Sequence, residues 1–417
     1  DVYKRQVLYI DTFATGTLQS IKDFAAQSPI ARVFGGQLDR VDVEGDASFD
    51  LEITLPLQSV RDYEFATRIR TSDGTVRVRG FQPPITGLNG TVTITRSDIS
   101  SESLFGTFLG NPVELELTRI GGPDAPHSAV LRGSGRTTAQ VLQDELQAPL
   151  GGVVEGDAAY EATIRFPNGR SPQPGPLQIS IASDLYGVRS NLPEPFGKSI
   201  EDTRNLAVTI EFPSPNQIAT AGSIAGDVNW TARFLKQGDA WDFDRGVVAI
   251  GEYPRAASVR GLHIHGQLAR LDLREWLAEG RRGNREVGLG ERVRTIDLGI
   301  DNLYAVGQRF TNQHVTIDRS GLDWVIRMSG REAEGIITVP YDFTGERPMT
   351  LDMDWLTLPG GEDTVAATKA SPLDPRTLPA LSIRATEFAL GERHFGQLEA
   401  EFERSPRGLE STRLETS

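Results

Sequence analysis

The stretch VEGDASFDLEI at residues 43–53 returns almost unchanged as VEGDAAYEATI at residues 154–164. Each copy follows a short helical pattern and leads into a segment in which apolar and polar residues alternate. A chain that uses one strand-rich unit repeatedly is typically built by stacking, and stacked units bury apolar surface only against their neighbours. The repeat therefore predicts an elongated β-sheet.

The repeated motif also contains carboxylates, which glycosidases need as a facing pair. An active site needs one such constellation, whereas a bend at the start of a strand is needed once in every repeat. We therefore interpret the motif as structural, with Gly45 and Gly156 permitting a bend or bulge.

Alternation with a period of two extends through most of the chain. It is clearest at residues 51–55, 113–118, 206–212 and 296–300, and it recurs at 76–79, 92–94, 177–181, 262–265, 351–355 and 381–384. Such segments form strands with one buried face. The Gly, Asn, Asp and Pro residues between them indicate short connections.

Helical patterns are few and short. They cover residues 18–26, 138–147 and 271–278, the last with Asp272 as its N-cap and Gly280 as its stop. Three short helices cannot cover a sheet of many strands. The sheet must therefore pack on a second sheet, close on itself, or curl into a trough whose apolar face meets something else.

Composition excludes several classes of protein. The chain has 417 residues, no cysteine and a net charge of -14. Without cysteine there are no disulfides and no thiolate metal sites. The acidic balance and the singly scattered Lys and Arg argue against nucleic acid as a partner. No apolar run approaches the roughly 20 residues that cross a bilayer.

The first six residues, DVYKRQ, match a translated adapter of transposon-based sequencing libraries, so we expect residues 1–6 to be an artefact. No linker divides the remainder. We predict β-repeats at 7–136 and 137–255, a third β segment at 256–368 and truncated C-terminal strands at 369–417.

Two further motifs could carry chemistry. Gly197-Lys198-Ser199 is similar to the end of a phosphate-binding loop, but Leu192 stands where the upstream glycine is required. His263 and His265 could share a strand face as metal ligands, but no other His is near in sequence. We interpret both as structural.

The placing of the tryptophans and the absence of catalytic motifs both argue against an enzyme. We interpret Trp276, in the third helical pattern, as a core anchor. The five tryptophans are dispersed, which does not suggest the aromatic-lined cleft of a carbohydrate-active enzyme. No Gly-x-Ser-x-Gly elbow and no cysteine nucleophile occur. The sequence therefore predicts a protein that is not an enzyme and uses no cofactor or metal.

Several motifs, taken in order, resemble the YhdP branch of the AsmA-like (AsmA/TamB-related) bacterial envelope proteins. They are SDLYG at 183–187, LPEPFGK at 192–198, GLHIHG at 261–266, GLDW at 321–324, GIITVP at 335–340 and DPRTLPAL at 374–381. The resemblance depends on their order and spacing, and it covers residues 7–417.

The resemblance implies a fold and a function. The fold is mainly β: an elongated, curled, predominantly antiparallel sheet that forms an open apolar groove. The function is a non-enzymatic conduit that carries phospholipid acyl chains across the periplasm of a Gram-negative bacterium. The family's proteins are held in the inner membrane by an N-terminal helix, which this C-terminal portion does not include. Envelope proteins are further expected partners.

On this interpretation, alternating apolar residues line the groove. They are Leu51, Ile53, Leu55, Val113, Leu115, Leu117, Leu206, Val208, Ile210, Phe212, Ile296, Leu298 and Ile300. A strand of six to eight residues spans roughly 20–26 Å, and one leaflet's acyl layer is about 15 Å thick, so a curled sheet could enclose lipid tails. The alternative is a structural or binding β-rod whose apolar faces pack on each other and leave no channel.

Overall fold

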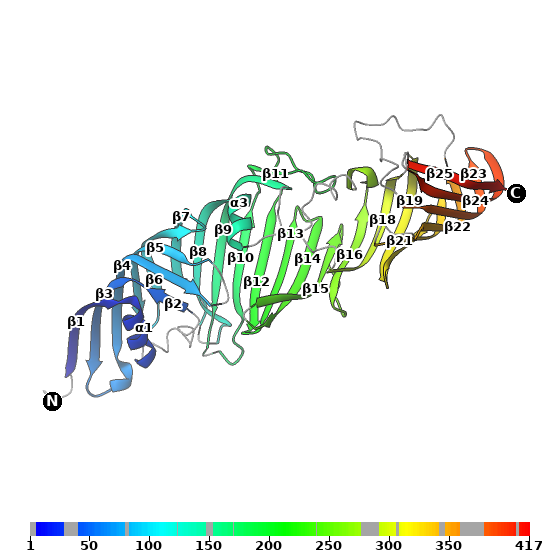
Figure 1. The fold of residues 1–417 in the computed structure, drawn as a ribbon. Coiled ribbons are helices and arrows are strands. Elements are labelled where there is room, and N and C mark those ends of the chain that lie inside the picture. The colour runs from blue at the N-terminus through cyan, green and yellow to red at the C-terminus, as the bar shows by residue number, and fades with distance from the viewer. Residues whose placement is uncertain are drawn as a thin grey trace.

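The computed structural model describes residues 6–28, 41–79, 83–122, 124–146, 153–169, 171–238, 240–276, 292–305, 308–341, 347–358, 379–405 and 408–417. In these residues the strands follow one another across one long sheet, and the two ends of the chain lie at opposite ends of it (Figure 1). The predicted fold class, a mainly β protein with an elongated and predominantly antiparallel sheet, is confirmed.

The strands of the N-terminal part are β1 (Val7–Thr17), β2 (Val41–Glu44), β3 (Asp46–Pro56), β4 (Glu64–Val78), β5 (Ile85–Thr95), β6 (Ile99–Phe108), β7 (Asn111–Arg119), β8 (His127–Thr138), β9 (Val154–Pro167), β10 (Leu177–Ser183) and β11 (Val188–Ser190). The C-terminal part contains β12 (Leu206–Ser214), β13 (Gln217–Ile224), β14 (Val228–Gln237), β15 (Ala240–Ile250), β16 (Gly261–Leu268), β17 (Leu271–Asp272), β18 (Val293–Ala305), β19 (Gln308–Ser320), β20 (Asp323–Ser329), β21 (Ala333–Pro340), β22 (Met349–Leu358), β23 (Leu381–Leu390), β24 (Arg393–Ser405) and β25 (Gly408–Thr416). Every predicted strand falls within these, except that Arg79 follows β4.

Neighbouring strands are mostly antiparallel. The exceptions are the pairs β15–β16, β16–β18, β17–β18 and β22–β23, which are parallel. β2 and β3 both pair with β4, and β10 and β11 both pair with β9. Within the described part of the chain β1 and β25 do not pair with each other, so the sheet stays open. The sheet contains strands from all four segments predicted between residues 7 and 417. The boundary predicted after Arg136 falls inside β8.

The predicted helices at 18–26 and 138–147 are present, and the one predicted at 271–278 begins two residues later, because Leu271–Asp272 form strand β17. α1 covers Leu18–Gln27, α3 covers Ala139–Leu146, and a helical turn occupies residues 273–276. Each is capped by a residue whose side-chain oxygen accepts a hydrogen bond from a backbone N–H. These capping residues are Thr17, Thr138 and Asp272. The predicted stop at Gly280 lies outside the described residues. A short 3-10 turn, η3 (Val60–Asp62), was not predicted.

The repeated motif has the same place in both copies. β1 leads into α1, and the chain returns antiparallel to β1 as β3. β8 likewise leads into α3, and the chain returns antiparallel to β8 as β9. In each copy the capping threonine is the pairing partner of the motif's aspartate, Thr17 with Asp46 and Thr138 with Asp157. The repeat is therefore a strand–helix–strand unit.

The two glycines of the motif take a conformation that other residues rarely adopt. The φ angle is +107° at Gly45 and +103° at Gly156. A Cβ atom on Gly156 would lie 2.1 Å from the carbonyl oxygen of Gly187. The predicted bend is confirmed, and close approach of the next strand adds a second reason for glycine.

We expect Gly156→Ala to lower the free energy of unfolding by roughly 3 kcal/mol or more, because a clash with backbone adds to the strain of the φ angle. Gly110→Ala is the control, since Gly110 also has a positive φ of +72° but open space around its Cβ position. That change should cost only about 1 kcal/mol. Urea unfolding of both variants measures the difference, and equal losses would contradict the close-approach argument.

Candidate functional site

One row of mutually paired residues crosses most of the sheet. It contains one residue from each main strand from β6 to β25: Leu104, Leu115, Gly133, Ala162, Ile181, Val208, Gly222, Trp230, Val248, Ile264, Ile296, Ile317, Ile326, Ile337, Leu351, Ile383, Ala400 and Leu414. We call it the apolar row, because every member is apolar or glycine. Directly paired residues point to the same face of a sheet. The row therefore defines one continuous apolar face.

The residues beside the row point to the other face and are largely polar. Examples are Glu114, Glu161, Asp297 and Arg327, each of which is adjacent in sequence to a member of the row. All four are exposed or half-buried. The sheet is therefore two-faced, with its charge on one side and its hydrocarbon on the other.

At the N-terminal end, helix α1 lies against the apolar face. Its residues Ile21 and Ala25 pack in one cluster with Phe49, Leu51 and Ile94 of the sheet. A small cavity of about 140 Å³ remains between the helix and the strands. α1 therefore covers part of this face.

Farther along, the face encloses a second hollow of about 80 Å³, which we call the apolar hollow. It is lined by Val76, Val78, Pro83, Ile85, Phe108, Val113, Leu115, Leu131, Gly133, Tyr160, Ala162, Ile164, Ile179 and Ile181. Val78 also packs against the buried cluster of Leu177, Ile179 and Phe212. Five strands separate β4 from β10 in the sheet, so the sheet curls until the end of β4 crosses the face.

Tyr160 is the one residue of this lining with a polar side chain. Its hydroxyl oxygen is buried and has no hydrogen-bond partner in the described part of the chain. Burial raises the pKa of Tyr160, so the group is a neutral donor at physiological pH. A buried polar group without a partner costs about 1–3 kcal/mol.

The predicted lining residues are distributed along the apolar face. The cluster beside α1 contains Leu51, Ile53 and Leu117, and the cluster at the apolar hollow contains Val113 and Leu115. The cluster around Leu177 contains Ile210 and Phe212. The largest cluster, which extends from β15 to β24, contains Ile296, Leu298 and Ile300. Leu55, Leu206 and Val208 are half-buried and lie outside these clusters. The structure therefore brings them together in local groups, and their role as a lining stays a prediction.

Sequence reasoning missed most residues of the apolar hollow. Val76, Val78, Ile179 and Ile181 were recognised as strand residues from their alternation. Nothing in the local pattern showed that β4 reaches β10, because that contact depends on how strongly the sheet curls.

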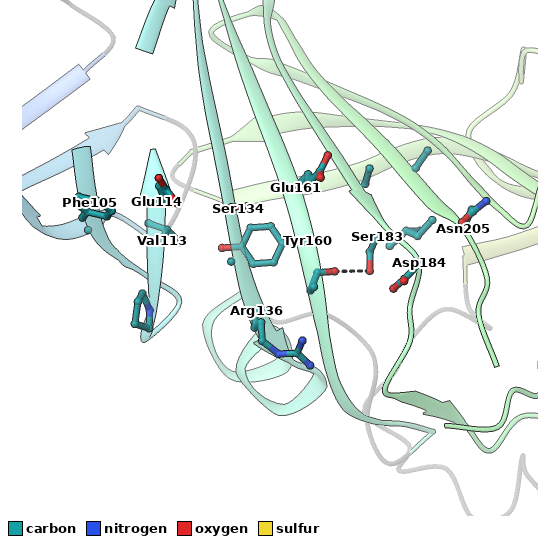
Figure 2. A pocket seen from close by; sticks show the side chains of 17 residues that line it. Phe105, Val113, Glu114, Ser134, Arg136, Tyr160, Glu161, Ser183, Asp184 and Asn205 are labelled. Carbon is teal, nitrogen blue, oxygen red and sulfur yellow. Dashed lines mark hydrogen bonds between the residues drawn. The ribbon is translucent and has the colours of Figure 1, made fainter. Parts of the chain in front are cut away.

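A wider hollow of about 940 Å³ crosses β6 to β10 and the start of β12 (Figure 2). Its lining includes Phe105, Glu114, Ser134, Glu161 and Ala182, which are successive pairing partners. They are one residue away from the apolar row in each strand, so they point to the polar face. Val113, Gly135 and Tyr160, which lie on the apolar face, also line this hollow, so side chains of both faces border it.

The lysine of the loop-like motif has a structural role. Lys198 is buried, and its ammonium group donates to the carbonyl oxygens of Val188 at 2.8 Å and Ser199 at 3.0 Å. Burial lowers the pKa of Lys198. Its donors are directed at backbone and not at an open phosphate site, as predicted.

The two histidines lie on the polar face and have protein partners. His263 Nδ1 is 2.8 Å from the hydroxyl of Thr295, and His265 bonds the carboxylate of Glu252. No group of three metal-ligating side chains occurs among the residues that the structure describes. Trp276 packs edge-on against Phe196, with ring centres 5.7 Å apart, which fits its predicted role as an anchor.

One polar cluster lies at the edge of the apolar face in its C-terminal part, away from the apolar row. Gln313, only 1% exposed, pairs with Ile300 in the register and donates to Glu332 at 3.2 Å. Thr311 donates to the same carboxylate from its backbone N–H and its hydroxyl. Burial opposes ionisation of Glu332, but these hydrogen bonds outweigh it and hold the pKa below the ordinary value of 4.5.

This lowered pKa predicts a pH dependence of stability. The stabilisation is present above the unfolded-state pKa and is lost as the pH falls through the lower folded-state pKa. Glu332→Gln should therefore be less stable than the wild type at neutral pH, and the gap should narrow below about pH 4. Thermal unfolding midpoints across this range measure it, with Glu387→Gln on an exposed strand position as control. A gap that stays constant would contradict the assignment.

A single open sheet with one continuous apolar face defines the structural class of this protein as a mainly β, open-sheet protein. Within this class the chain belongs to the YhdP family: the family model described as YhdP protein matches residues 1–417. The predicted family is therefore confirmed.

The chain is similar to the intermembrane phospholipid transporter YhdP of Escherichia coli strain K12. The two are 21% identical over 420 residues, which cover 96% of this chain and 32% of the relative. The chain thus spans about a third of the relative's length. No solved structure matches it. Among the described helices, none is both long and apolar enough to cross a membrane.

Proposed function

We propose that this chain is part of a non-enzymatic lipid conduit whose apolar face carries phospholipid acyl chains across the periplasm, between the inner and the outer membrane. The observation that carries the proposal is the apolar row, because it offers hydrocarbon contact along the sheet without a break. The name of the Escherichia coli relative, an intermembrane phospholipid transporter, supports it.

The energetics explain why an unbroken face matters. Moving a chain of roughly fifteen methylenes into water costs about 12 kcal/mol at ~0.8 kcal/mol each, so a lipid crosses an aqueous gap slowly without help. Contact with a continuous apolar face removes most of that barrier. The headgroup would stay in water at the open side of the sheet, so no catalytic group or cofactor is required.

The lining of this groove includes the residues predicted from alternation, and we extend it to the apolar row. In the full-length protein, an N-terminal helix would hold the conduit in the inner membrane of a Gram-negative bacterium. Envelope proteins at its ends would be further partners. These statements rest on the family.

A structural or binding β-rod is the competing function. In its sandwich form it requires a second sheet to bury the apolar face. The described strands form one sheet, and α1 covers only its N-terminal end. This observation favours the conduit.

We expect the double variant Val208→Glu/Ile210→Glu to lose most of the phospholipid that co-purifies with the full-length protein. Both side chains are half-buried on the apolar face of β12, and a carboxylate there would be desolvated by a passing acyl chain. Native mass spectrometry and lipid extraction measure the bound phospholipid.

The matched control is Asn205→Glu/Ala207→Glu, which adds the same charge at exposed positions: Ala207 lies next to Val208 on the polar face of β12, and Asn205 directly precedes the strand. It should retain wild-type lipid content. If both variants retain it, or if the wild type carries no phospholipid, the conduit proposal is wrong.

A further inference from the structure

We propose that the apolar hollow is a distinct binding site for one acyl chain, closed by the end of β4 and the start of β5, in which the Tyr160 hydroxyl donates a hydrogen bond to the carbonyl oxygen of the acyl ester. This inference rests on the proposed function and deepens it. It adds a defined position, and a group that recognises the ester, to a face that otherwise offers only hydrocarbon contact.

The first observation is that the apolar face is covered at this place. Val76 and Val78 at the end of β4, with Pro83 and Ile85 before and at the start of β5, form one wall of the hollow. Ile164, Ile179 and Ile181 of β9 and β10 are part of the opposite wall. We call Val76 and Val78 of β4, together with Pro83 and with Ile85 of β5, the crossing arms. A chain that moves along the face must pass beneath them.

The second observation is the size and the apolar lining of the hollow. Its volume of about 80 Å³ is lined by apolar side chains apart from Tyr160. Apolar cavities of about 150 Å³ stay dry and take up small apolar ligands. The hollow therefore has room for a short length of hydrocarbon, and more of the chain would enter as the crossing arms separate.

The third observation is the buried Tyr160 hydroxyl. Tyr160 lines both the apolar hollow and the wider hollow, and its hydroxyl lies close to Gly135 of the wider hollow, whose missing side chain leaves the space, since a Cβ there would be 2.9 Å from the hydroxyl oxygen. The register pairs Gly135 with Tyr160, so the ring lies across β8. A pure hydrocarbon occupant would leave this donor without an acceptor, whereas an acyl ester supplies a carbonyl oxygen.

The site can be tested with a phosphatidylcholine that carries a photoreactive diazirine in one acyl chain, supplied in vesicles to the full-length protein. Mass spectrometry then locates the crosslinks. We expect crosslinks to the lining of the apolar hollow, besides crosslinks elsewhere on the apolar face. Crosslinks elsewhere but none at the hollow would overturn this inference alone. Their complete absence from the apolar face would overturn the proposed function as well.

Ala162→Leu tests whether the acyl chain needs the open volume of the apolar hollow. Ala162 lies on the floor of the hollow between Gly133 and Ile181, and a leucine there would fill it. Crosslinks at the hollow should fall at least threefold, while those on β18 to β21 stay unchanged. Ala182→Leu is the matched control, because Ala182 is exposed on the polar face of β10. Equal crosslinking at the hollow in the two variants would contradict the site.

Tyr160→Phe tests the hydrogen bond and keeps the ring in place. The variant should reduce crosslinks at the hollow about fivefold for the diester lipid, the loss expected for one neutral hydrogen bond. For the diether analogue, which has no carbonyl oxygen, the variant and the wild type should be equal. An equal effect on both lipids would show that the hydroxyl does not recognise the ester.

Discussion

The pairing register is the constraint on which the rest of this structure depends. In a sheet, a slip of one residue moves every side chain of a strand to the other face. The apolar row from Leu104 to Leu414 exists only because each strand keeps its register with the next. The row passes through antiparallel and parallel pairs alike, so the hydrocarbon face does not depend on strand direction.

Local irregularities protect this register. Between β14 and β15 the pairing shifts after Arg233, so that Phe234 lies opposite Phe243. Without the extra residue, Phe234 would lie opposite Asp244. The bulge instead leaves Asp244 buried with the guanidinium groups of Arg233 and Arg245. The hydrogen bond from Arg233, above all, holds the pKa of Asp244 below its usual value, so the buried group stays charged and paired.

A two-faced open sheet has consequences for both of its sides. The polar side carries charged side chains such as Glu114, Glu161 and Asp297, in a chain with a net charge of -14. The apolar side is covered in places, by α1 at one end and by the end of β4 in the middle, and it packs on itself where the sheet curls. The motifs around Lys198 and His263 have protein partners: Lys198 donates to a backbone carbonyl oxygen, and His263 bonds the hydroxyl of Thr295.

The sequence by itself determined the periodicity, and therefore the strands, the short helices, the glycine bends and the family. These are local properties: alternation at Leu206–Phe212 predicts a strand, and Thr138 before an apolar turn caps a helix, whatever lies elsewhere. Only the tertiary structure decided which strands meet across the face. The contact between Val78 and the residues around Ile179, and the buried hydroxyl of Tyr160, depend on the accumulated twist and curl of many strands, which no short stretch of sequence encodes.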